Sequence, residues 1–85
     1  MKNDNPIYSD IKDILANRFE NAVCSTDKSK AEVARYCGVA RQTLAKYMDG
    51  VNTIPVDVTK TVAELSGIDV HYLLGKDITT TFRGQ

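Results

Sequence analysis

The 85-residue chain has too little of several residue types for the functions that depend on them. It contains two cysteines, Cys24 and Cys37, and one histidine, His71, without the paired spacing of a metal site. Unpaired thiols are typical of a reducing compartment, which favours a cytoplasmic protein. No apolar run is long enough to span a bilayer, so we predict no membrane partner.

Catalytic groups are equally scarce. His71 is the only imidazole that could serve as a base, and nothing in the pattern orients it for nucleophilic catalysis. Four of the five glycines stand at expected helix ends, and none are clustered in a phosphate-binding loop. We therefore predict that the protein is not an enzyme, has no catalytic residue and needs no metal or cofactor. No small-molecule ligand is evident either.

The chain as a whole has no excess of positive or negative charge, but one segment of it does. Eleven basic residues balance 11 acidic ones, so no global positive field draws the chain onto nucleic acid. From Lys28 to Lys46, however, five residues are basic and only Glu32 is acidic. This uneven distribution favours a molecule with one basic face.

Apolar periodicity predicts one small, compact all-α domain of five helices. A first helix over 7–22 would bury a stripe of apolar residues, namely Ile7, Ile11, Ile14, Leu15, Phe19 and Ala22. Further helices are predicted from Ser29 to Cys37, from Arg41 to Asp49, from Pro55 or Val56 to Ser66, and from Asp69, as N-cap, to Leu74. The last of these would close the core with Ile68, Val70, Leu73 and Leu74. Residues 1–6 are expected to form a flexible arm, 7–75 the domain, and 76–85 a tail or a short dimerisation strand.

Local signals define the second and third helices. Ser29 and Glu32 have the spacing of a capping box, and Gly38 stands where the chain must leave a helix with positive φ. Val39, Leu44 and either Tyr47 or Met48 would point inward. The third helix would then present its polar side chains, Arg41, Gln42, Thr43 and Lys46, to solvent. Two short helices joined by a glycine turn, with a polar second helix, are typical of a DNA-binding helix-turn-helix.

The helix order and spacing resemble those of the lambda-repressor and Cro-like transcriptional regulators. The stretch 29–50 carries the resemblance through small or apolar residues at matching positions, namely Ala34, Gly38, Val39, Leu44 and Gly50. A weaker resemblance covers 67–75. The resemblance implies a five-helix lambda-repressor-like DNA-binding domain whose second and third helices form the helix-turn-helix.

The resemblance also implies which residues touch DNA. Arg41, Gln42 and Lys46 would face base edges or nearby phosphates, with Thr43 next in line. Lys30 would contact the phosphate backbone, and Asn52 would touch the backbone or a base. Lys28 and Arg35 would also contact phosphates, an expectation that comes from their charge and not from the resemblance. Two positions depart from the family pattern: Lys30 stands where glutamine is common, and Ala40 replaces a frequent capping serine or threonine.

The function implied is that of a sequence-specific transcriptional regulator of the phage or prophage repressor type. It would bind a palindromic double-stranded DNA operator as a homodimer. The dimer contact stays open between Leu73 with Leu74 and pairing of the segments 78–82 as strands. An antitoxin-type DNA-binding protein that also binds a partner protein is the alternative, and a helical scaffold that binds no DNA is a third.

Overall fold

The structure is a computed structural model that describes the backbone of residues 6–78 and the side chains of residues 11–78. It contains five named helices: α1 (Pro6–Ser25), α2 (Lys30–Cys37), α3 (Arg41–Met48), α4 (Val56–Ser66) and α5 (Val70–Leu74). A further helical turn covers residues 76–78, and no strand occurs among the residues described. The expectation of a compact all-α domain is therefore confirmed.

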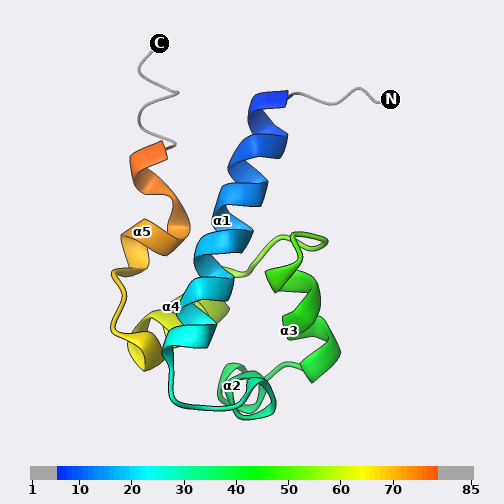
Figure 1. Ribbon diagram of the computed structural model, residues 1–85, viewed down its shortest axis with the longest axis vertical. Helices are drawn as coiled ribbons and strands as arrows, with labels where there is room; N and C mark the ends of the chain where they lie inside the picture. Colours follow the sequence, from blue (N-terminus) through cyan, green and yellow to red (C-terminus); the bar gives the residue numbers. More distant parts are fainter. Residues whose placement is uncertain (1–5, 79–85) are drawn as a thin grey trace.

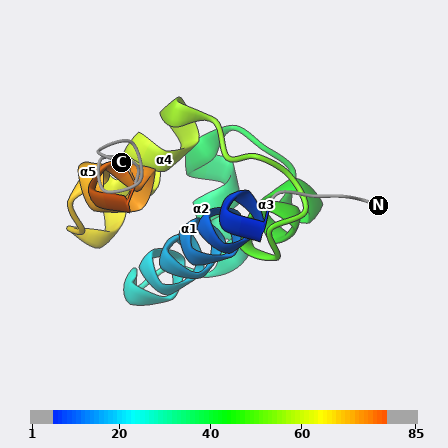
Figure 2. The same cartoon turned by 90° about the horizontal axis from the view of Figure 1, so that it is seen from above.

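The long helix α1 organises the fold. It lies between α5 on one side and α3 on the other, while α2 and α4 are at its C-terminal end (Figure 1). The view from above shows the same order, with α5 and α3 on opposite sides of α1 (Figure 2). This arrangement leaves α3 at one flank of the molecule, with one side against α1 and the other directed outward.

The hydrophobic core lies where α1, α2, α3 and α4 meet. Its largest fully buried side chains are Phe19, Leu44, Val23, Val33 and Val62. The ring of Phe19 meets the ring of Tyr47 edge to face, with centroids 6.3 Å apart, so α1 and α3 are joined by an aromatic pair. Leu73 is also buried, whereas Ile68, Val70 and Leu74 are only half-buried at the edge of the core.

The predicted helix stops are confirmed. Four glycines follow the ends of α2, α3, α4 and α5 with φ between 73° and 78°, namely Gly38, Gly50, Gly67 and Gly75. Gly75 is also close to α1, because a Cβ at this position would lie 2.5 Å from Cδ2 of Leu15. At Asp69, the predicted N-cap of α5, the carboxylate accepts a hydrogen bond from the His71 N–H at 3.0 Å.

Several predictions about the first helix were wrong. The helix begins at Pro6, a residue of the predicted arm, and it continues three residues beyond Ala22. Ile14 is 40% exposed because it lies about 140° around the helix from Phe19, nearly on the opposite face. Ala16 and Val23 are buried beside Phe19 instead.

Ile7 was predicted to join the buried stripe, but its side chain lies outside the part that the structure describes. Residues 1–5 of the predicted arm also lie outside it. At the other end of the chain, Ile78 belongs to the helical turn 76–78, so the strand interpretation is wrong for this residue. Residues 79–85 lie outside the part of the chain that the structure describes. Across that described part, no helix is long and apolar enough to cross a membrane.

Candidate nucleic-acid interface

The start of α2 is fixed by the predicted capping box. The Ser29 Oγ accepts a hydrogen bond from the Glu32 N–H at 3.2 Å, and Glu32 Oε1 accepts one from the Ser29 N–H at 3.0 Å. The bond from the Ser29 backbone lowers the pKa of Glu32, and the positive charges of Lys28 and Arg35 act in the same direction. These two cations are therefore electrostatically coupled to an acid of α2.

The turn between α2 and α3 depends on Gly38. Its φ of 73° is a left-handed conformation, which costs least for a residue without Cβ. The Gly38 N–H donates to the Arg35 carbonyl at 3.1 Å, and the Val39 N–H donates to the Ala34 carbonyl at 3.0 Å. Ala34 is 3% exposed. These bonds reverse the chain within three residues, so α3 begins at Arg41.

One side of α3 is anchored in the core. Leu44, Tyr47 and Met48 are all buried, so both of the alternatives considered for the last inward position are correct. The end of the helix also lies against α1, because a Cβ at Gly50 would be 3.4 Å from the Cβ of Ala16. The inward side chains thus fix how α3 is rotated about its own axis.

The remaining side of α3 forms a continuous exposed arc. Its members are the exposed residues of the helix and its C-cap, namely Arg41, Gln42, Ala45, Lys46 and Asp49. At about 100° per residue they span about 140°, with Arg41 at one edge and Lys46 at the other. We call this set the α3 arc. Thr43 is half-buried and lies beyond the Lys46 edge, so the structure does not group it with the other predicted base-contacting residues.

Two members of the α3 arc were missing from the sequence prediction. Ala45 and Asp49 follow Arg41 at intervals of four residues, so the three residues lie along nearly one line of the helix surface. Ala45 is not polar, and Asp49 has the opposite charge to the basic residues that are expected to contact DNA. The helical spacing from Arg41 is the signal that could have identified both.

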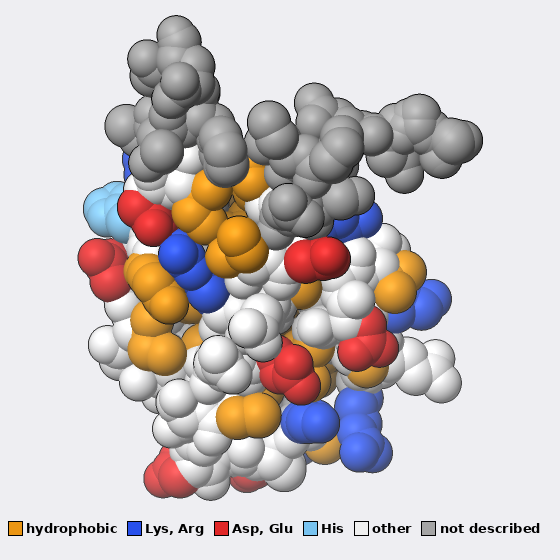
Figure 3. Space-filling model, turned by 45° about the horizontal axis from the view of Figure 1, so that its top comes forward, with side chains coloured by type: hydrophobic (Ala, Val, Ile, Leu, Met, Phe, Trp, Pro, Cys, Tyr) orange, Lys and Arg blue, Asp and Glu red, His pale blue; other side chains and the backbone are white. Residues whose placement is uncertain are grey.

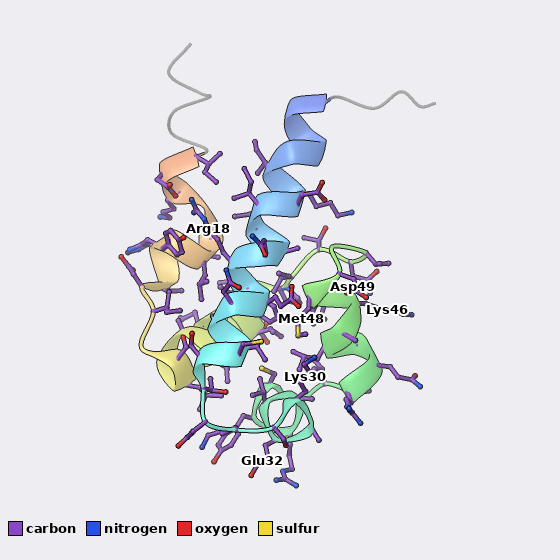
Figure 4. The ribbon with its side chains drawn as sticks, in the orientation of Figure 1. Arg18, Lys30, Glu32, Lys46, Met48 and Asp49 are labelled. Atoms are coloured by element: carbon purple, nitrogen blue, oxygen red, sulfur yellow. The ribbon has the colours of Figure 1, made fainter. Side chains whose placement is uncertain are left out.

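The predicted phosphate-contacting residues fall into two groups. Lys30 is exposed in the first turn of α2, on the part of that helix nearer α3, whereas Glu32 lies on the opposite side (Figure 4). Asn52 is exposed beyond the end of α3, and its N–H lies 3.5 Å from the Lys46 carbonyl. Lys30 thus lies on the side of α2 toward α3, and Asn52 lies close to Lys46 at the edge of the α3 arc.

Lys28 and Arg35 form the second group. The Lys28 Nζ lies 5.1 Å from the centroid of the Tyr36 ring, a cation–π contact that keeps this half-buried side chain against α2. Arg35 is exposed in the last turn of α2, where a cation also interacts favourably with the helix dipole. The structure thus gives both residues interactions with α2.

Basic and acidic side chains are mixed on the surface. Lysine and arginine side chains gather toward the side on which α3 lies in Figure 1, but acidic side chains lie among them (Figure 3). Figure 4 shows one such neighbourhood, where Lys46 and Asp49 both project from the C-terminal half of α3. The expected basic face therefore also carries acidic groups.

A separate cavity of about 280 Å³ lies between α1, the loop after α3 and α5. Its lining is mostly apolar and includes Leu15, Ile54 and Leu74. The volume is just below the range of about 300–1,000 Å³ that is usual for ligand pockets.

Comparisons of the chain with protein-family models, with curated proteins and with solved structures find no match. The case for a function therefore depends on the α3 arc and its setting.

Proposed function

We propose that the protein is a sequence-specific double-stranded DNA-binding transcriptional regulator of the phage repressor type. In this proposal α2, the Gly38 turn and α3 act as a helix-turn-helix, and α3 enters the major groove. The function and the lambda-repressor-like assignment are supported by the sequence resemblance over 29–50 and by the helix geometry of the same stretch.

The observation that carries the proposal is the α3 arc. A helix of eight residues buries one side completely through Leu44, Tyr47 and Met48 and leaves a polar arc with a cation at each edge. An α-helix fits the width of the major groove of B-DNA, where each base pair presents a distinct pattern of donors and acceptors. A rigidly anchored helix with an outward polar arc is what such reading requires.

The roles follow from side-chain chemistry. Arg41 can donate two hydrogen bonds to guanine O6 and N7, and Gln42 can bond adenine N6 and N7, each pair contributing ~1–3 kcal/mol of discrimination. Lys46 at the edge of the arc, Asn52 beyond the end of α3 and Lys30 on α2 suit phosphate contacts, which set the register of the helix without reading sequence.

Two copies on a symmetric operator would supply the specificity that one small module lacks. The half-sites would then lie about 34–36 Å apart, one turn of DNA. Leu73 is 3% exposed within a single copy, so it offers little surface for a dimer contact. Leu74 is half-buried, and most of the segment 78–82 lies outside the described residues.

Selection from a random double-stranded DNA pool tests the proposal. Wild type should enrich a symmetric motif, and the variant Arg41→Ala/Gln42→Ala should lose at least about tenfold in affinity for it, since each contact contributes more than ~1 kcal/mol. Lys60→Ala is the matched control, because Lys60 is an exposed lysine of α4 outside the arc. Enrichment of no motif by wild type, or equal binding by the double variant, would refute the proposal.

Salt dependence provides a second readout. The affinity should fall as salt rises, because each lysine that neutralises a phosphate releases a counterion from the DNA. If Lys30 neutralises one phosphate, Lys30→Ala should make the slope of log K against log salt shallower by about one. The base preferences of this variant should stay the same. A change of preferred sequence with no change of slope would assign Lys30 to bases rather than to phosphates.

A further inference from the structure

The middle of the α3 arc is occupied by Gln42 and by the two residues that were missing from the sequence prediction. Measured around the helix from Arg41, Ala45 lies at about 40°, Asp49 at about 80°, Gln42 at about 100° and Lys46 at about 140°. Both Ala45 and Asp49 are exposed. Whatever surface α3 meets, these two residues are presented to it at least as directly as the cations at the edges.

We propose that Ala45 and Asp49 determine part of the base specificity, Ala45 by selecting thymine and Asp49 by selecting cytosine. This inference rests on the proposed function, since it assumes that the α3 arc lies in the major groove. It names the bases that the centre of the arc accepts.

Ala45 presents an exposed methyl group. In the major groove only thymine presents an apolar group, its C5 methyl, and alanine is one of the side chains that contact it. The side chain is too short to reach past Arg41 or Gln42 toward the phosphates. An exposed methyl surrounded by long polar side chains therefore matches one base chemically.

Asp49 presents an exposed negative charge. A carboxylate on a surface facing phosphates is repelled unless a donor compensates it, and the only major-groove donors are the amino groups of cytosine and adenine. Adenine presents its N7 acceptor next to that amino group, which a second carboxylate oxygen would meet unfavourably. Cytosine presents its N4 amino group without such an acceptor, so cytosine is the base that fits.

No interaction within the described part of the chain accounts for Asp49 in another way. Among the residues whose side chains the structure describes, its carboxylate forms no hydrogen bond or ion pair, although Lys46 lies one turn away. The spacing also predicts the order of the bases. Arg41, Ala45 and Asp49 are separated by about 6 Å each along the helix. Since base pairs rise about 3.4 Å, the thymine and the cytosine should lie one or two base pairs apart.

The experiment uses the full chain and the motif that wild type enriches. Replacing thymine by deoxyuridine, one position at a time, removes only the methyl group. At one thymine of each half-site we expect about a fourfold loss of affinity for wild type, the value of one buried methylene. Ala45→Gly should show no further loss at that position. Because glycine also weakens a helix, the wild-type measurement stands on its own if the variant does not fold.

For Asp49 the test is a switch of preferred base. Asparagine can bond adenine N6 and N7, so Asp49→Asn should change the preference at one position from cytosine to adenine by at least about tenfold. Glu64→Gln is the matched control, since Glu64 is an exposed acid on α4 and the change removes the same charge. It should leave every preference as in wild type.

The outcomes separate the two proposals. If wild type enriches no motif, the proposed function fails. If wild type enriches a motif that depends on Arg41 and Gln42, but every thymine tolerates loss of its methyl, the role of Ala45 is overturned. If Asp49→Asn strengthens binding to all sequences alike and changes no preference, Asp49 acts only as a charge and its role is overturned.

Discussion

The N-caps of α2 and α3 are a matched pair that differ in one hydroxyl group. Ser29 has φ −71° and ψ 162°, and Ala40 has φ −70° and ψ 152°, so the two backbones are nearly superimposable at the cap. Only Ser29 has an oxygen that accepts a hydrogen bond from the first turn. We predict that Ser29→Ala destabilises the protein by about 1 kcal/mol, within the usual range of about 0.5–2 kcal/mol, and that Ala40→Ser stabilises it.

The expected gain at Ala40 is smaller than the loss at Ser29. A serine at position 40 can accept a bond from the N–H of Thr43, three residues on, as Ser29 does from Glu32. Thr43 has no carboxylate to bond back to the cap, so only half of a capping box forms. We expect a gain of about 0.5 kcal/mol, the low end of the range. The two changes should add, since they affect different helices.

Urea denaturation followed by circular dichroism at 222 nm measures both changes. The urea concentration at the midpoint should fall for Ser29→Ala and rise for Ala40→Ser, with no change in the slope of the unfolding free energy against urea. In thermal unfolding, each 1 kcal/mol should move the melting temperature by about 4–8 °C. Ser25→Ala is the control, because the Ser25 hydroxyl donates to the Asn21 carbonyl at the end of α1 and caps no helix N-terminus. If Ala40→Ser leaves the midpoint unchanged or lowers it, the equivalence of the two caps is wrong.

Three further predictions concern the core, an ion pair and the thiols. Leu44→Ala should cost about 2–5 kcal/mol in urea denaturation, because it leaves a cavity where α3 meets the core. The Arg18 guanidinium, 3.0 Å from Asp77, holds the pKa of that carboxyl below its usual value. The stabilisation from this ion pair should therefore be complete above the ordinary pKa of an aspartate and be lost as the pH falls through the lower pKa of Asp77 in the folded protein. Asp77→Asn should reduce this acid sensitivity. Burial raises the pKa of the Cys37 thiol, so mass spectrometry should show iodoacetamide modifying exposed Cys24 first in the native protein.

Each of these three predictions has a control or an outcome that would contradict it. Val51→Ala removes an apolar group that is 60% exposed and should change stability by less than about 0.5 kcal/mol. An equal acid sensitivity of Asp77→Asn and wild type would contradict the role of the ion pair. Both thiols should react together in urea, and equal native rates would contradict the protection of Cys37.

The sequence predicted the helix boundaries best where the signal is local. A capping box, a left-handed glycine and an N-cap aspartate act within one turn of a helix, and the structure has all three at the predicted residues: Ser29 with Glu32, Gly38 and Asp69. The end of α1 was predicted three residues early because no glycine or proline follows Ala22, so no local signal ends the helix.

Burial depended on more than periodicity. Ile14 is as apolar as Ile11, yet it is exposed, because the packing of α3 and α5 on either side of α1 determines which part of that helix is covered. For the same reason the sequence could not choose between Tyr47 and Met48, and both are buried. Apolar periodicity identifies the side of a helix that is buried, but it does not give the width of the surface that the neighbouring helices cover.

The candidate site shows the same division. The residue types of 29–50 are enough to predict that a polar helix follows a glycine turn, because the hydrogen bonds that form this turn are local. Which side of that helix faces outward depends on long-range packing, because the rotation of α3 is fixed by contacts of Tyr47 and Leu44 with a core assembled from distant segments. That rotation places Ala45 and Asp49 at the centre of the α3 arc and leaves Thr43 half-buried at its margin.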